Sequence, residues 1–229
     1  MHLFPVFLRL ENQPCVVVGA GPVGLSKTRA LLDAAALVTV IEPRPSSSLR
    51  TLCESFRSLR LHPRAFATGD TRGALLVFAC TGVVEVQAAV AADASRSGAL
   101  LCRADDAEAG DFTTAAVLRR GPLAVAVSSG GASPALAARA RDAAAGAIGQ
   151  EYGGAAEVLG RLRIELRKMA VTQGRRAATL RWILDQGLLE LVRQGSTSRI
   201  DALVTDALAR AARQPGLDEQ ASEVDPCTA

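Results

Sequence analysis

A glycine-rich turn near the N-terminus has the spacing of a dinucleotide-binding loop. The loop consists of Gly19, Ala20, Gly21, Pro22, Val23 and Gly24. It follows an apolar run over 15–18 and precedes a helical pattern over 25–35. In such a GxGxxG loop the glycines permit a tight turn, close backbone approach to a pyrophosphate, and close packing of helix on strand, in that order. The following helix start offers amide donors to an anion. We therefore predict a nucleotide phosphate site here, in preference to a ligand-free turn.

A carboxylate follows the next apolar run at the distance expected for ribose recognition. Glu42 lies 18 residues after Gly24, where a dinucleotide-binding fold places a carboxylate on the adenine ribose hydroxyls. A carboxylate there repels a 2′-phosphate, so NAD is favoured over NADP as the cofactor. Arg44, which follows Pro43, weakens this preference because a guanidinium can neutralise a phosphate. The alternative is that Glu42 is a solvated residue at a strand end.

The elements that must position these residues alternate along the first part of the chain. Apolar strand patterns cover 15–18, 37–41, 74–79, 99–101 and 123–127, and helical patterns cover 25–35 and 85–97. Continuous apolar strands joined by helices are typical of a parallel sheet that is covered on both faces. We therefore predict an α/β fold with a Rossmann-type doubly wound sheet. Thr81, just after the strand at 74–79, is expected to lie beside the cofactor.

The second part of the chain is predicted to be helical. Ser133 and Pro134 have the types preferred just before and at the first position of a helix. From about Gly149 onward, apolar residues recur at helical spacing, which indicates a C-terminal helical lobe. Ser198 is expected to cap its last helix. The acidic segment after Pro215 is expected to be a solvated tail.

Composition excludes several classes of protein. Of 229 residues, 49% are hydrophobic, which excludes a disordered chain. A net charge of +3 and 3% aromatic residues argue against a nucleic-acid partner. No apolar run is long enough to span a membrane and no secretory signal is visible, so a cytoplasmic location is expected. Five scattered cysteines and two histidines disfavour disulfides and a protein-held metal site.

These motifs together resemble the precorrin-2 dehydrogenase/sirohydrochlorin ferrochelatase family, the module that forms the N-terminal part of siroheme synthases. The resemblance rests on the Phe-Pro segment over 3–8, the glycine loop, Lys27 and the Ser-Ser-Gly-Gly-x-Ser-Pro motif over 128–134. It implies NAD-dependent oxidation of precorrin-2 to sirohydrochlorin. Insertion of a ferrous or cobalt ion, with the divalent metal as a substrate, is a further activity that the residues leave open.

The resemblance also implies a catalytic carboxylate. The family aspartate that precedes an Asp-Phe pair matches Asp105, with Asp106 as its rival. Near the nicotinamide, such a carboxylate can accept a proton as general base. The family has asparagine and proline where this chain has Cys102 and Ala115, which bears on the local loop geometry. Without the resemblance, the paired aspartates would be read as an exposed turn.

The tetrapyrrole substrate carries eight carboxylates, so anion donors are expected in its site. The proposed donors are the backbone groups of Ser128, Ser129, Gly130 and Gly131. Ser129 also occupies a position that is phosphorylated in some relatives, which would repel the acidic substrate. Weaker candidates, each more often a solvated residue, are Arg119, Arg120, Arg139, Arg141, Arg175 and Arg176.

The resemblance implies a homodimer and a division of the chain. We expect an NAD-binding domain over 1–112, a dimerisation segment over 113–147, a helical domain over 148–215 and a flexible tail over 216–229. Two other functions remain open. One is a non-catalytic NAD-sensing regulatory module, and the other is a dehydrogenase that lacks chelatase activity.

Overall fold

The computed structural model describes residues 3–106, 108–169 and 171–213. Contacts divide the chain into two compact units. The first contains residues 1–115 and 128–134, and the second contains residues 116–127 and 135–229. Each unit is described separately below.

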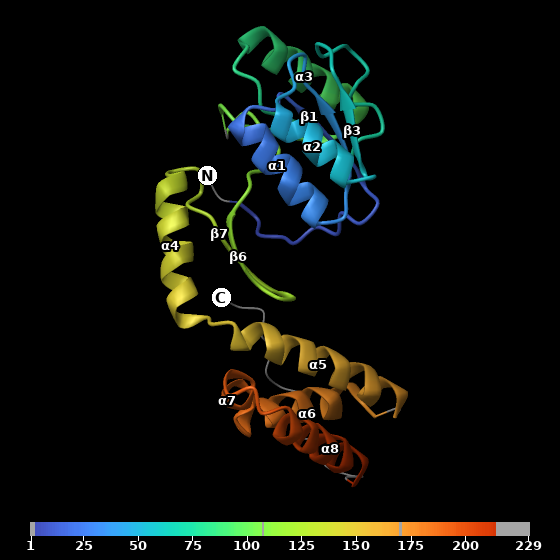
Figure 1. Cartoon of the computed structure of the whole chain (residues 1–229), viewed down its shortest axis with the longest axis vertical. Coiled ribbons are helices and arrows are strands. Elements are labelled where there is room, and N and C mark those ends of the chain that lie inside the picture. Colours follow the sequence, from blue (N-terminus) through green and yellow to red (C-terminus); the bar gives the residue numbers. More distant parts are fainter. Residues whose placement is uncertain (1–2, 107, 170, 214–229) are drawn as a thin grey trace. The chain divides into compact units, whose positions relative to one another are not determined.

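The first unit is built on a five-stranded parallel sheet (Figure 1). Its strand order is β3-β2-β1-β4-β5. The strands are β1 (Pro14–Val18), β2 (Leu37–Ile41), β3 (Leu59–His62), β4 (Leu76–Ala79) and β5 (Leu100–Arg103). The helices that connect them are α1 (Pro22–Asp33), α2 (Ser47–Ser55) and α3 (Val84–Ser97). The predicted doubly wound parallel fold is therefore confirmed.

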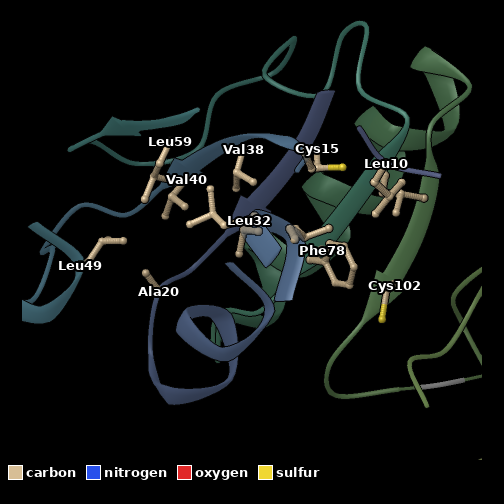
Figure 2. Packing of buried hydrophobic residues seen from close by; sticks show 14 residues of the cluster. Leu10, Cys15, Ala20, Leu32, Val38, Val40, Leu49, Leu59, Phe78 and Cys102 are labelled. Carbon is tan, nitrogen blue, oxygen red and sulfur yellow. The ribbon is translucent and has the colours of Figure 1, made fainter. Parts of the chain in front are cut away.

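Both faces of this sheet are buried, which explains the continuous apolar strands. Along β1, Val17 packs in a cluster with Leu31 and Leu32 of α1, whereas Val16 and Val18 pack in a second cluster on the α3 side. Successive side chains of a strand point to opposite faces. Figure 2 shows the cluster on the α1 side, where Phe78 and Cys102 lie among its members.

Some boundaries differ from the sequence predictions. Helix α1 begins at Pro22 rather than at residue 25, so Gly24 lies inside the helix. The stretch between β2 and β4 has no continuous apolar run that predicts a helix or strand, yet it contains α2 and β3. Helix α2 has nine residues; Leu49 is its fully buried residue, and Leu52 and Cys53 pack partly buried against the same cluster.

The second unit contains an antiparallel hairpin and five helices among the described residues. Strands β6 (Ala116–Arg120) and β7 (Leu123–Val127) pair with each other, so the strand expected at 123–127 belongs to a separate two-stranded sheet. The helices are α4 (Pro134–Ala147), α5 (Glu151–Lys168), α6 (Gln173–Asp185), α7 (Leu188–Arg193) and α8 (Thr197–Arg213). In the described parts of the chain, no helix is long and apolar enough to cross a membrane.

Helix starts in this unit show one correct and one wrong prediction. Helix α4 begins at Pro134, as expected from Ser133 and Pro134. Ser198 is not the cap of the last helix, because α8 begins at Thr197 and the Ile200 amide already bonds to the Ser196 carbonyl. The predicted tail over 216–229 lies outside the described residues.

A buried carboxylate ties the loop that precedes β4 to α3. Asp93 accepts hydrogen bonds from the Gly69 amide at 3.0 Å, from the Thr71 hydroxyl at 2.7 Å and from Arg96 at 3.0 Å. Burial alone would raise its pKa, but these hydrogen bonds outweigh burial and lower the pKa to about 2. Asp93 therefore stabilises the fold as a charged group.

We expect Asp93→Asn to lower the free energy of unfolding at pH 7 by about 2 kcal/mol. The folded-state pKa is depressed, so this stabilisation is complete above about pH 5 and is lost as pH falls toward 2. Urea denaturation at pH 7 and pH 3 measures both effects. Asp33→Asn, on the exposed end of α1, is the matched control. An unchanged midpoint for the Asp93 variant at pH 7 would contradict the assignment.

Candidate functional site

The sheet reverses its strand order between β1 and β4, and the candidate site lies at the carboxyl end of these strands. In open parallel α/β sheets, ligands bind at such a switch point. Three of the predicted residues or loops follow neighbouring strands here: the glycine loop follows β1, Thr81 follows β4 and Asp105 follows β5. Because neighbouring strands are about 5 Å apart, the glycine loop and Asp105 are separated by roughly 10 Å across the sheet.

Two glycines of the loop are required by close backbone contacts. Gly19 has a φ of +90°, and a Cβ built there would lie 2.7 Å from the Cys80 carbonyl oxygen. A Cβ on Gly24 would collide with the carbonyl oxygen of Gly19. Both contacts involve backbone atoms, which cannot turn away as a flexible side chain can. The first and third glycines therefore close the turn and seat α1 against the end of β1.

The second glycine has a different environment. A Cβ on Gly21 would meet no atom within 4 Å, so space is open in front of the first residue of α1. Gly21 occupies the N-cap of α1, and no side chain caps this helix end. The first turn of a helix leaves amide groups without intrahelical partners, and these favour an anion. Val23 belongs to this turn and is exposed. The open space and the uncapped helix start fit the pyrophosphate of a dinucleotide.

Glu42 forms a hydrogen bond with the glycine loop, beside which it is expected to bind the adenine ribose. Its Oε2 accepts from the Ala20 amide at 2.8 Å, and its Oε1 accepts from the Arg44 amide at 2.9 Å. Each carboxylate oxygen can accept a second hydrogen bond, so ribose hydroxyls can still be bound. Pro43 and Arg44 lie exposed beside it. Glu42 is thus a partly buried residue that fixes the glycine loop, not a freely solvated strand end.

Thr81 lies in the turn after β4, which is fixed by a residue that the sequence interpretation missed. The Gln87 side-chain nitrogen donates to the Thr81 carbonyl oxygen at 2.8 Å, and the Thr81 hydroxyl accepts from the Val83 amide at 3.2 Å. Gln87 is buried, and its Oε1 has no partner among the described residues. A buried acceptor without a partner costs free energy unless a ligand or water satisfies it. The contribution of Gln87 to the site is the hydrogen bond that fixes the turn at Thr81.

The segment that contains Asp105 forms a loop, and hydrogen bonds join the end of this loop to β5. Asp111 accepts from the Leu101 amide through its Oδ2 at 2.8 Å, and its own amide donates to the Leu101 carbonyl at 2.8 Å. Phe112 then packs edge-on against Phe78, with ring centroids 5.4 Å apart. These contacts return the chain to β5 and keep the loop at the carboxyl edge of the sheet.

The two aspartates of this loop have different surroundings. Asp106 accepts from the Glu108 and Ala109 amides at 3.0 and 3.3 Å, which is a local turn cap. Asp105 instead forms two hydrogen bonds with Arg103, from Nε at 3.1 Å and from Nη2 at 2.7 Å. The Arg103 guanidinium lowers the pKa of Asp105, although partial burial opposes this. With 43% of its side chain exposed, Asp105 remains accessible.

A lysine of α1 and two thiols lie close to the same edge. Lys27 donates a hydrogen bond to the Thr114 hydroxyl, which ties α1 to the segment after Phe112. Burial raises the pKa of Cys80 to about 11, because a thiolate is disfavoured away from water. The pKa of Cys102 is also raised by burial. Neutral thiols are poor nucleophiles, so covalent cysteine chemistry is not expected here.

The serine-glycine motif forms a closed turn before α4. The Ser129 hydroxyl donates to the Ser133 carbonyl at 2.9 Å and accepts from the Ser133 amide at 3.0 Å. The Gly130 amide donates to the Ser128 hydroxyl at 3.1 Å. The turn therefore uses the Gly130 amide and both hydroxyls internally. The substrate-binding role of Ser128, Ser129, Gly130 and Gly131 stays a prediction.

The six candidate arginines all belong to the second unit. Four of them donate hydrogen bonds within that unit. Arg141 donates to the Asp142 carboxylate, and the other three donate to backbone carbonyl oxygens: Arg120 to Ile148, Arg175 to Ala211 and Arg176 to Val171. Over the described ranges, no group of three or more His, Cys, Asp or Glu side chains could hold a metal ion.

Two family models match the chain. An NAD(P)-binding family matches residues 6–116, which includes the glycine loop and Asp105. The family of the central part of sirohaem biosynthesis proteins matches residues 120–142.

Curated relatives and a solved structure extend this likeness. A siroheme synthase of Methylococcus capsulatus is 34% identical over 214 residues, which cover 93% of this chain and 45% of that protein. A siroheme synthase of Chromobacterium violaceum is 41% identical over 153 residues, which cover 67% of this chain and 32% of that protein. The chain thus spans less than half the length of these relatives. The structure of SirC, precorrin-2 dehydrogenase, has the same fold, with a TM-score of 0.73 and 22% identity, and covers 93% of this chain and 100% of SirC.

Proposed function

Because the chain belongs to the siroheme synthase family and contains its NAD(P)-binding part, we propose that it oxidises precorrin-2 to sirohydrochlorin with NAD as the oxidant. The observation that carries this proposal is a glycine loop, with open space before an uncapped helix start, on the same sheet edge as an accessible aspartate two strands away. A hydride acceptor and a proton acceptor are the two groups that such an oxidation requires.

The chain's own residues would hold the dinucleotide along the carboxyl edge. The start of α1 at Gly21, Pro22 and Val23 would bind the pyrophosphate, and Glu42 would bind the adenine ribose. The turn at Thr81, fixed by Gln87, would position the nicotinamide end. When bound, NAD supplies the acceptor for a hydride from the macrocycle. The Glu42 carboxylate favours NAD over NADP because it repels a 2′-phosphate.

Asp105 would complete the reaction as general base. Oxidation of precorrin-2 releases a hydride and a proton, and the Asp105 carboxylate would take the proton on an oxygen. Its lowered pKa keeps it ionised at neutral pH but also makes it a weaker base than an unpaired aspartate. Since its side chain is partly exposed, the proton can then pass to solvent. Asp106, whose carboxylate caps a turn, is less suited to this task.

Metal insertion into sirohydrochlorin is the second activity that the family resemblance implies. On this proposal a ferrous or cobalt ion is a substrate, and the macrocycle nitrogens are its main ligands. The same Asp105 carboxylate would take up the two displaced pyrrole protons one after the other, passing the first to solvent before it accepts the second. No cluster of metal-ligating side chains exists in the described part of the chain, so the protein would contribute a proton acceptor and not a metal cage.

We further propose a homodimer in the cytoplasm, with the segment over 113–147 as the dimerisation segment. Helix α4 buries only Ala137 and leaves Leu136 59% exposed, which suits an interface helix. The proposed division into an NAD-binding domain over 1–112 and a helical domain over 148–215 goes with it.

Anaerobic incubation with precorrin-2 and NAD tests the proposed function. We expect the absorbance to change to that of sirohydrochlorin, at a higher rate with NAD than with NADP. Ferrous or cobaltous ion is then added, and a metallated product would assign the chelatase activity as well. Sirohydrochlorin alone would assign a dehydrogenase without chelatase activity. No spectral change despite NAD binding would contradict the enzyme assignment and favour an NAD-sensing module.

A further inference from the structure

Arg103 uses only one edge of its guanidinium in the pair with Asp105. This edge consists of Nε and one N–H of Nη2, which reach the two carboxylate oxygens at 3.1 and 2.7 Å. A guanidinium has five N–H donors in a plane, so the adjacent edge of Nη1 and Nη2 can form a second fork of the same kind. In the described ranges, no residue accepts a hydrogen bond from Nη1 of Arg103.

Arg103 lies at the carboxyl edge of the sheet, two residues before Asp105. It is the last residue of β5 and pairs in register with Ala79, the last residue of β4. The next amide, that of Ala104, still bonds to the Ala79 carbonyl at 3.1 Å, so the backbone around Arg103 is held by the sheet. Only 20% of the Arg103 side chain is exposed. The guanidinium is therefore a positioned group at the sheet edge and not a mobile surface arginine.

The charge around Asp105 makes this cation important for an anionic substrate. Between residues 100 and 115 the chain contains four carboxylates, those of Asp105, Asp106, Glu108 and Asp111, and Arg103 is the only lysine or arginine. Like charges repel an approaching polycarboxylate, and a partly buried arginine fork is the group best suited to bind one of its carboxylates. Arg103 is therefore the group of this segment that can attract a carboxylate of the substrate.

We propose that Arg103 binds a peripheral carboxylate of the tetrapyrrole through its Nη1 and Nη2 edge while its other edge holds Asp105. One planar group then sets the position of the substrate relative to the proton acceptor. This inference rests on the proposed function and adds a substrate-binding residue to it. A second anion on the guanidinium also reduces the positive charge felt by Asp105, which increases its proton affinity once the substrate is bound.

The test compares Arg103→Lys and Arg103→Met with Arg60→Lys, a control on the exposed, opposite edge strand β3. Lysine keeps the positive charge but cannot form paired hydrogen bonds with two carboxylates at the same time. We expect both Arg103 variants to raise KM for precorrin-2 by about 10-fold to 100-fold, the effect of losing a charge-assisted pair. KM for NAD should stay within about twofold, and Arg60→Lys should leave both constants unchanged.

A binding measurement without turnover separates the two proposals. Uroporphyrin, a fluorescent tetrapyrrole with eight carboxylates, serves as the probe, and its fluorescence is titrated with each variant. We expect its Kd to rise with both Arg103 variants and not with Arg60→Lys. Wild-type protein that neither oxidises precorrin-2 nor binds uroporphyrin would contradict the proposed function itself. Active wild-type protein together with unchanged KM and Kd in folded Arg103 variants would overturn the role of Arg103 alone. Thermal unfolding with bound NAD verifies that the variants are folded.

Discussion

Asp105→Asn is expected to lower kcat for precorrin-2 oxidation by about 10²-fold to 10⁴-fold, the usual contribution of a positioned general base. Asparagine has nearly the same shape and can still accept a hydrogen bond from Arg103, but it cannot take up a proton near neutral pH. NAD affinity should remain unchanged, because Asp105 lies beyond β4 from the glycine loop. Stopped-flow absorbance gives the rate, and NAD titration gives the affinity.

Asp106→Asn is the matched control for this prediction. Asp106 accepts two backbone amides within its own loop, so its loss should affect local order more than kcat. The expected change in kcat is less than about tenfold, because an exposed turn cap contributes only about 1 kcal/mol. If Asp106→Asn abolishes turnover while Asp105→Asn does not, the two roles must be exchanged. If neither variant loses activity, no carboxylate of this loop is the base.

The glycine loop was predictable because the spacing of its glycines, between a strand and a helix, is typical of a dinucleotide-binding turn. A strand, a GxGxxG pattern and a helix occur together only when the turn must be tight. The structure adds the reason for two of the positions, since the Gly19 and Gly24 carbons face backbone atoms. The parallel sheet followed from the same principle, because its strands are apolar on both faces.

The contacts around Asp105 were not predictable in the same way. Residues two apart in an extended segment share a face, so Arg103 and Asp105 had a usable spacing, but many such pairs never meet. Gln87 interrupts the buried helical stripe that includes Val90 and Ala94. A polar residue on an apolar stripe is a sequence signal for a buried side chain with a hydrogen-bond role. Which atoms Gln87 bonds to depends on the turn at Thr81, which no local pattern specifies.

The hairpin in the second unit had a clear but overlooked signal. Only Gly121 and Pro122 separate β6 from β7, and a two-residue connection of this kind predicts antiparallel pairing. The apolar run over 123–127, considered alone, has the same pattern as the strands of the parallel sheet. Parallel pairing of β6 with β7 would require a crossover of a dozen or more residues, which a two-residue connection cannot provide.

Gly21→Ala is expected to weaken NAD binding by about 10-fold to 100-fold without unfolding the protein. Gly21 has φ −63° and ψ −172°, an extended conformation that alanine adopts readily. Its added methyl group would meet no protein atom within 4 Å, so it would occupy the space in front of α1 instead. The free energy of unfolding should therefore change by less than about 0.5 kcal/mol. Equilibrium dialysis with NAD and urea denaturation measure the two quantities.

Gly24→Ala is the informative counterpart, because its methyl group would collide with the Gly19 carbonyl inside the folded protein. Overpacking against backbone costs about 1–3 kcal/mol, so this variant should lose stability even without NAD. Comparison of the two variants shows which glycine leaves room for the ligand and which leaves room for the packing of α1 on the loop. Equal NAD affinity in wild type and Gly21→Ala would mean that the pyrophosphate does not lie on the start of α1. In that case the nucleotide site, and with it the alignment of cofactor and Asp105 across the sheet edge, would have to be placed elsewhere.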